Sequence, residues 1–372
     1  DIGLSDTLAM RVSGYAARQD GLVKLLDFGC ANPTLVGDTS APYSIANTSP
    51  PQDCNRGTLG NTDVQAARLQ LRWTPTDNLE INLSGGLSED KAAGAADVLV
   101  WMDPAGFANL KVPGTDDPYF LTYYGVPYDT RFVPTERNTS YATFEDPVYG
   151  LKFKPDNTLS TRDLTLHVNL DINPDLQLTS ITGYRRIAGS WAYDSDSSPL
   201  STDAVHNTQR HEQFSQELRL SGSSLSDRFN WTVGGFYYHA KQRDIGTIEA
   251  VPFNLFIQVD SYPENTNWAA FAHGEFAITD QLRLIGGIRY SEEDKNYRFI
   301  EHDIPGTPSN VFPGGLDAPK STSYERVDWR AGLQFDVNED HMIYANVATG
   351  FRGGGFNPRP SNLQTVVPFQ PE

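Results

Sequence analysis

Apolar and polar residues alternate one by one along many stretches of this chain. The stretch 282–290 is a clear case. Its apolar positions include Leu282, Leu284, Ile288 and Tyr290, and its alternate positions include Arg283, Gly287 and Arg289. A period of two residues places successive side chains on opposite faces of a β-strand. The stretch therefore predicts a strand with one apolar face and one polar face.

The same alternation recurs from one end of the chain to the other. Regular runs occupy 79–87, 164–172 and 329–337. Weaker runs occupy 8–14, 67–73, 176–184, 214–220, 229–237, 268–278 and 342–351. With 282–290 these runs predict about eleven strands, joined as neighbours in an antiparallel sheet.

Six short turns separate these strands in pairs. Each has an Asp near its centre, and they occupy 4–8, 75–79, 173–176, 225–229, 279–282 and 338–342. About 50 to 100 residues lie between successive turns, so each interval holds two strands and a long loop. The long loops are expected at about 21–60, 90–160, 195–208, 245–262, 300–322 and 357–372. Short turns on one side and long loops on the other are typical of transmembrane β-barrels.

Composition supports strands over helices as the membrane-crossing elements. The mean hydropathy is −0.45, and no run approaches the roughly 20 apolar residues of a membrane helix. A soluble β-sandwich also alternates. However, Arg68, Gln70 and Arg72 lie deep within one predicted strand, which favours a hydrated interior, and aromatic residues gather near strand ends, as at membrane interfaces. The net charge of −18 argues against a nucleic-acid partner.

The two cysteines, Cys30 and Cys54, fall in the expected loop 21–60. Free thiols are the alternative, but outside the cytoplasm a disulfide is favoured. Closing an interval of this length would stabilise the fold by about 3 kcal/mol.

Few residues carry the spacing of a metal or catalytic site. Asp194, Asp196 and Ser198 are spaced as in a calcium loop, but Pro199 and Val205 stand where that loop needs Gly and Glu. The stretch therefore favours a solvated acidic loop. The seven histidines show no zinc spacing. We expect no metal site, no cofactor and no enzyme.

The two pairs that could be written as part of a catalytic set are His211 with Glu212 and His302 with Asp303. Neighbours on a strand point to opposite faces, so neither pair is expected to cooperate. The expected loop 90–160 is rich in aromatic residues and contains Arg131 and Arg137. These side chains either form a mouth for a bulky ligand or pack the loops against one another, and the sequence leaves both open.

Five stretches resemble barrel strands of the TonB-dependent outer-membrane receptors, in the order in which that family has them. They are LSDTLAMRVSGYAARQDGLVK (4–24), LQLTSITGYRRIAGSWAYDSDSSP (176–199), FSQELRLSG (214–222), WTVGGFYYH (231–239) and IYANVATGFRGGGFNP (343–358). The resemblance implies about half of a 22-stranded plugged barrel. The sequence lacks a recognisable plug domain and the later strands, so we expect 1–372 to be a barrel fragment.

The resemblance also implies a function for the parent protein. It would sit in the Gram-negative outer membrane, among lipid and lipopolysaccharide, and import a bulky scarce nutrient, by default a ferric siderophore. The TonB complex would act through the missing N-terminal region. A passive porin-like channel, or TonB-dependent uptake of cobalamin or a saccharide, are the alternatives. The expected substrate contacts are Arg185, Arg186, Tyr193, Tyr290 and Arg352.

Overall fold

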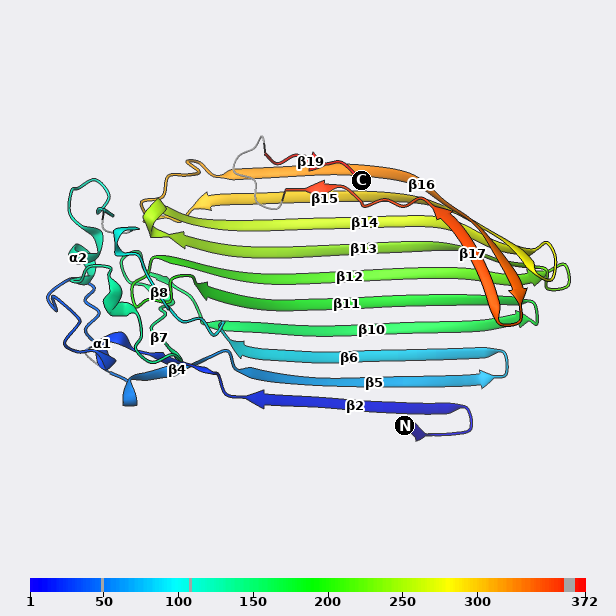
Figure 1. Ribbon diagram of the computed structural model, residues 1–372, viewed down its shortest axis with the longest axis horizontal. Coiled ribbons are helices and arrows are strands. Elements are labelled where there is room, and N and C mark those ends of the chain that lie inside the picture. The colour runs from blue at the N-terminus through cyan, green and yellow to red at the C-terminus, as the bar shows by residue number, and fades with distance from the viewer. Residues whose placement is uncertain (48–49, 107–108, 358–364) are drawn as a thin grey trace.

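The computed structural model describes residues 1–47, 50–106, 109–357 and 365–372, and its main body is one antiparallel sheet of 12 strands. The strands lie side by side in chain order, with β2 near one edge and β17 at the other (Figure 1). They are β1 (Ile2–Gly3), β2 (Leu8–Gln19), β5 (Thr62–Thr76), β6 (Leu79–Ala93), β10 (Asp156–Asn173), β11 (Leu176–Asp194), β12 (Asp203–Ser224), β13 (Phe229–Ala250), β14 (Leu255–Ala277), β15 (Leu282–Asp303), β16 (Leu316–Asn338) and β17 (His341–Ala348). The eleven predicted strands are thus confirmed, and β1 adds a two-residue strand.

The register of the sheet gathers the alternating apolar residues on one side. Cross-strand partners share a face, and Leu83 pairs with Leu166, Tyr184 with Phe214, and Ile288 with Trp329. The side that carries these residues is called the apolar face, and the other side the polar face.

Large side chains on the apolar face remain uncovered. Val12 is 63% exposed, Ile288 55% and Leu218 49%. An apolar surface of this extent on a water-soluble protein would be unusual. It is what a barrel wall presents to lipid.

The strands are longer than a bilayer requires. Crossing takes about 9–11 residues, whereas β12 to β16 have 22 or 23 residues each. Apolar side chains dominate the apolar face only over the part next to the short turns. Farther along, Arg186, Glu212 and Lys241 occupy the same face, so this half of the sheet extends beyond the apolar band.

Three of the expected loops are much shorter than predicted. The stretches 195–208, 245–262 and 300–322 reduce to 195–202, 251–254 and 304–315, because the strands continue into them. Asp203 pairs with Ala250, Ala250 with Leu255, and Glu301 with Leu316. Apolar and polar residues alternate only where one face of the strand contacts lipid. Beyond that region the strands remain paired by backbone hydrogen bonds, although the alternation has ended. The expected loop 357–372 includes 358–364, which lie outside the described residues.

The short turns lie together at the end of the sheet opposite the loops (Figure 1). Asn173 Oδ1 accepts a hydrogen bond from the Asp175 amide at 2.9 Å, and Asn338 Oδ1 accepts one from the Asp340 amide at 3.0 Å. Side chains that bond their own backbone two residues on favour such turns. In these two turns the Asn, and not the central Asp, makes that bond.

The two longest excursions fold together at the other end, as the left side of Figure 1 shows. We call the described residues of 21–61, 94–155, 195–202 and 251–254 the loop cap. A small sheet joins its two main segments: β3 pairs with β4 in one excursion and with β7 in the other. The elements of the cap are β3 (Val23–Leu26), α1 (Phe28–Ala31), η1 (Gln52–Cys54), β4 (Asn55–Leu59), η2 (Pro104–Gly106), α2 (Tyr119–Tyr124), η3 (Thr130–Phe132), β7 (Thr139–Ser140), β8 (Glu145–Asp146), β9 (Leu151–Lys152) and η4 (Val251–Phe253).

The segment after β17 turns back over the polar face and forms a two-stranded sheet of β18 (Gly355–Phe356) and β19 (Pro368–Phe369). Tyr324 on β16 donates a hydrogen bond to the Phe369 carbonyl at 3.1 Å. None of the helices in the described ranges has the length and apolarity needed to cross a bilayer.

Candidate functional site

The loop cap has an aromatic core of its own. Tyr119, Tyr124 and Phe132 are almost fully buried, and the rings of Phe28 and Phe132 meet edge to face at 5.0 Å. Arg131 forms an ion pair with Asp129 at 2.8 Å, which leaves it engaged within the cap. Most aromatic residues of 90–160 therefore pack the loops together rather than line a mouth.

Trp101 is the exception, with 74% of its surface exposed. It lies between β6 and α2 in the chain. Unlike the buried rings of the aromatic core, it offers a flat apolar surface to solvent. Among the described aromatic residues of 90–160, Trp101 is the most exposed.

Two acidic side chains meet inside the cap, where β8 lies against the end of β13. Asp146 and Glu249 are both almost completely buried. Asp146 Oδ1 accepts a hydrogen bond from the Val148 amide at 2.8 Å, and Ser201 Oγ donates to Glu249 Oε1 at 2.5 Å. Their other oxygens have no donor when both groups are ionised. A proton on either group lets the two share a hydrogen bond.

Burial and the neighbouring Asp146 raise the pKa of Glu249 to about 8. Burial also raises the pKa of Asp146. The pair is therefore an acid–carboxylate contact that holds the cap to the sheet while it keeps a proton.

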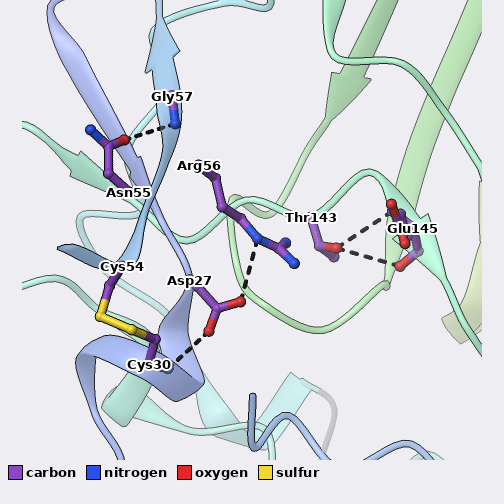
Figure 2. A network of polar contacts seen from close by, with 8 residues as sticks. All are labelled: Asp27, Cys30, Cys54, Asn55, Arg56, Gly57, Thr143 and Glu145. Carbon is purple, nitrogen blue, oxygen red and sulfur yellow. Dashed lines mark hydrogen bonds and ion pairs between the residues drawn. A yellow bond between two sulfur atoms is a disulfide. The ribbon is translucent and has the colours of Figure 1, made fainter. Parts of the chain in front are cut away.

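A disulfide joins Cys30 and Cys54, whose Cα atoms are 5.4 Å apart, and it ties α1 to the start of β4 (Figure 2). Asp27 caps α1 by accepting a hydrogen bond from the Cys30 amide at 2.8 Å, and its other oxygen lies 3.3 Å from Arg56 Nε. An acid that accepts from the first amides of a helix stabilises its start.

Arg56 borders a cavity of about 280 Å³ in the loop cap. Asp27, Thr143 and Glu145 also line it, as do Tyr43 and Tyr141. Figure 2 shows Arg56 between Asp27 and the Thr143–Glu145 pair, which comes from the other excursion. The cavity thus combines one guanidinium, two carboxylates and phenol groups at the junction of the two excursions.

The acidic stretch at the end of β11 is not the solvated loop that the sequence favoured. Asp194 is buried, and its Oδ2 accepts a hydrogen bond from the Thr143 amide at 2.9 Å. Burial and the nearby Asp196 raise its pKa. Tyr128 donates to Asp196 at 3.2 Å. These carboxyls act as acceptors that fasten the long excursion to the hairpin at 195–202. Among the described residues, no group of three or more His, Cys, Asp or Glu side chains is arranged to hold a metal.

The five expected substrate contacts do not converge. Arg185 and Tyr193 lie on the polar face of β11, eight residues apart, which is about 26 Å along a strand. Arg186 and Tyr290 lie on the apolar face, so they point away from a barrel interior.

Tyr290 belongs instead to the outer aromatic residues, because its ring lies 5.3 Å from that of Trp268. Arg186 pairs with Glu212 at 3.3 Å on the same side. Arg352 follows β17, is exposed, and exchanges two backbone hydrogen bonds with Glu372. The alternation in the sequence did not resolve which face each of these residues occupies.

A second cavity, of about 380 Å³, lies on the polar face near the loop end. We call it the upper cavity. His211, Tyr238, Asp244, Asn265, Lys295 and Tyr297 line it together with Phe356, whose ring stacks on Tyr297 at 5.4 Å. Lys295 donates to the Gly354 carbonyl and lies 3.3 Å from Glu293. Sequence reasoning missed these residues, although the polar alternation continues through β12 to β15 and would have indicated them.

Below the upper cavity, Arg289 lies on the polar face between two aromatic rings. Its guanidinium carbon is 5.7 Å from the Phe236 ring centre and 5.8 Å from that of Phe271, and its Nε donates to Ser291 Oγ at 3.0 Å. An arginine held on aromatic faces presents a fixed positive charge. From Arg289 up to the upper cavity, the polar face therefore offers cationic, aromatic and hydrogen-bonding groups suited to binding an anionic ligand, with no covalent step implied. We take it as the candidate functional site.

Residues 104–372 match the family model described as TonB dependent receptor-like, beta-barrel. The pesticin receptors of Yersinia enterocolitica and Yersinia pestis are 23% identical to this chain over 232 residues. Those alignments cover 58% of this chain and 32% of each relative.

Solved structures with this fold include the ferric yersiniabactin uptake receptor FyuA from Yersinia pestis. The TM-score is 0.65 at 15% identity, and the alignment covers 99% of this chain and 46% of FyuA. The ferric preacinetobactin receptor BauA from Acinetobacter baumannii aligns at a TM-score of 0.54 and 12% identity, over 100% of this chain and 46% of BauA.

The chain thus spans less than half the length of these relatives. Its sheet follows the barrel strands of receptors of known structure, with one apolar and one polar face. The family model covers well over half of its residues. The chain belongs to the TonB-dependent receptor family, as part of its β-barrel.

Proposed function

We propose that the protein containing this chain is an outer-membrane receptor that binds a ferric siderophore and imports it with energy supplied through the TonB complex. The family match over residues 104–372 carries this proposal. The apolar face supports a place in the outer membrane, because it exposes large apolar side chains on strands long enough to cross a bilayer.

Two observations support an iron chelate as the substrate. Similar structures include a ferric yersiniabactin receptor and a ferric preacinetobactin receptor. The polar face also carries Arg289 and, farther toward the loop end, Lys295, and cationic groups attract an anionic chelate. The TonB complex would act through a part of the protein outside this chain.

Uptake of radiolabelled ferric chelates tests the proposal directly. Cells with and without the intact gene receive a panel of ferric siderophores, with and without an uncoupler of the inner membrane. We expect at least one chelate whose uptake needs both the gene and the energised membrane. Uptake that needs the gene but not energy would establish a passive porin-like channel. Loss of cobalamin or saccharide uptake alone would establish a different substrate.

Two substitutions test the candidate site in the same assay. Lys295→Gln and Arg289→Gln each remove one positive charge from the polar face, and a charged hydrogen bond contributes about 1.5–3 kcal/mol. We expect the Kd for the chelate to rise by about 10-fold or more. Lys91→Gln is the matched control, because Lys91 lies on the other face and is exposed. Equal effects in all three variants would exclude this site.

A further inference from the structure

A group of basic residues lies on the apolar face beyond the apolar band. Its members come from four neighbouring strands, and we call it the outer basic patch: Arg162, Arg186, Arg210, Lys241 and Arg243. Two of the five have acidic partners, since Arg186 lies 3.3 Å from Glu212 and Lys241 lies 3.3 Å from Glu264.

Of the other three, Arg162 lies close to Glu89, whose pKa is lowered mainly by Lys91 and also by Arg162. Arg210 and Arg243 form no ion pair in the part of the chain that the structure describes. Arg210 and Arg243 are direct cross-strand partners. The guanidinium of Arg243 lies 5.8 Å from the ring centre of Tyr262. Like charges directly opposite each other on a sheet are destabilising, and such a pair stands out in a chain with a net charge of −18. An anion bound between the two arginines would remove this repulsion.

The surface between the strands has the shape and chemistry for that anion. Arg210 and Arg243 border a hollow of about 450 Å³, within the range of ligand pockets. Its other walls include the hydroxyl residues Thr158, Ser160, Ser190 and Thr208. Small residues at positions 188 and 189 leave the floor open.

Hydrogen bonds already fix two of these hydroxyls, those of Thr158 and Ser190. Thr158 Oγ1 and Ser190 Oγ lie 3.0 Å apart, and Ser190 Oγ donates to Asp156 at 3.1 Å. That carboxylate is itself paired with Lys154 at 2.6 Å. Its negative charge is therefore balanced outside the hollow.

The distance of the hollow from the apolar band indicates that a lipid headgroup lies against it. Tyr184 and Phe214 are cross-strand partners at the edge of the apolar band. Arg210 lies four residues beyond Phe214, about 13 Å along the strand and about 9 Å above the band for a strand tilted by about 45°. This is where the headgroups of an outer leaflet lie if the apolar band spans the hydrocarbon layer. Arginine binds phosphate through paired N–H groups.

We propose that this hollow binds a phosphate group of an outer-leaflet glycolipid, with Arg210 and Arg243 on the phosphate and the hydroxyls of Ser160 and Thr208 on the attached sugar. The inference rests on the outer-membrane location in the proposed function. It adds a specific lipid contact on the side of the wall opposite the candidate substrate site.

Native mass spectrometry of the whole receptor, extracted in mild detergent, tests this site. The protein is titrated with lipopolysaccharide, with the same glycolipid after enzymatic removal of its phosphates, and with inorganic phosphate. We expect the Arg210→Gln/Arg243→Gln variant to bind lipopolysaccharide at least 10-fold more weakly than the wild type. Arg185→Gln is the control, because Arg185 lies on the opposite, polar face of β11, three residues from Ala188, the partner of Arg210, toward the short turns. It should bind lipopolysaccharide like the wild type.

Arg210→Lys/Arg243→Lys keeps the charge and should recover part of the affinity, which separates loss of the site from misfolding. Equal binding of lipopolysaccharide by wild type and the Gln variant would overturn the proposal. So would equal binding of the phosphate-free glycolipid by the wild type. Inorganic phosphate that competes as well as the glycolipid at equal concentration would show a free-anion site instead. Ferric chelate binding is measured on the same samples. If the Gln variant loses lipid binding and keeps chelate binding, the lipid site is supported. If the wild type binds the lipid normally and binds no chelate, the result counts only against the proposed substrate.

Discussion

Asp146 and Glu249 form a buried contact between the loop cap and the sheet. Both are buried, and no lysine or arginine is paired with either in the described ranges. A buried carboxyl without a cation keeps its proton in the folded protein. In the unfolded chain both groups ionise near their ordinary pKa values, so the stability of this contact depends on pH.

The direction of that dependence follows from the raised pKa of Glu249, about 8 against an ordinary 4.5. Below about pH 4.5 the carboxyl is protonated in both states, and its contribution to stability is fully present. Between 4.5 and 8 only the unfolded chain loses the proton, so stability falls as pH rises. We expect protease cleavage within residues 94–155 to accelerate across this interval and to level off above it.

Glu249→Gln keeps the size and the hydrogen bond from Ser201 but removes the titration. This variant should show a flat cleavage profile over the same interval. Glu145→Gln is the control, since Glu145 is half exposed and pairs with Lys152 at 2.8 Å. A wild-type profile in Glu249→Gln would show that this carboxyl does not control attachment of the cap.

The Cys30–Cys54 disulfide acts at the scale of one element. It closes the first excursion and fixes the position of α1. Asp27, which caps α1, is thereby held close to Arg56. We expect Cys30→Ser/Cys54→Ser to destabilise this excursion by about 3 kcal/mol. Amide exchange in residues 28–47 should accelerate, while exchange in the central strands stays unchanged. Chemical reduction of the wild type should give the same exchange pattern. Unchanged exchange in 28–47 would mean that the aromatic core alone holds the excursion.

Strand β15 shows the two faces at the scale of one strand. Ile288 lies on the apolar face next to Trp329, and Ile285 lies on the polar face opposite Gly332 and Glu275. The same change, Ile→Arg, can therefore be made on either side. Arginine facing lipid costs up to about 2–4 kcal/mol, so Ile288→Arg should reduce the amount of folded receptor in the outer membrane and lower its resistance to denaturation.

Ile285→Arg serves as the paired variant, because its guanidinium meets water and Glu275. Heat-modifiable gel mobility and urea titration in lipid vesicles measure both variants. If Ile285→Arg were the more damaging of the two, the faces would be assigned the wrong way round.

At the scale of the whole molecule, the sequence predicted the membrane-crossing strands better than the upper halves of the strands and the loop cap. Leu282, Leu284 and Ile288 repeat with the period of a strand because lipid selects alternate residues, and all eleven predicted strands form. The upper half of each strand lacks that selection. Therefore Glu249 and Glu301 fall in strands although the sequence predicted loops at 245–262 and 300–322.

The loop cap depends on contacts between residues far apart in the chain, such as Phe28 with Phe132 and Asp146 with Glu249. No local pattern encodes these pairs. The expected substrate contacts do not share one face for a related reason. Arg185 and Arg186 are adjacent in sequence but occupy opposite faces, and only the register decides which of them faces the barrel interior.

Site-directed spin labelling along β15 in intact outer membranes is the strictest test of whether this sheet separates lipid from an aqueous interior. Single cysteines are introduced at each position from 283 to 290 in a receptor whose Cys30–Cys54 bridge is intact. Accessibility is measured to oxygen, which concentrates in lipid, and to a water-soluble nickel complex. We expect oxygen maxima at 284, 286, 288 and 290, and nickel maxima at 283, 285, 287 and 289. A profile without two-residue alternation, or one with the two sets exchanged, would contradict this expectation.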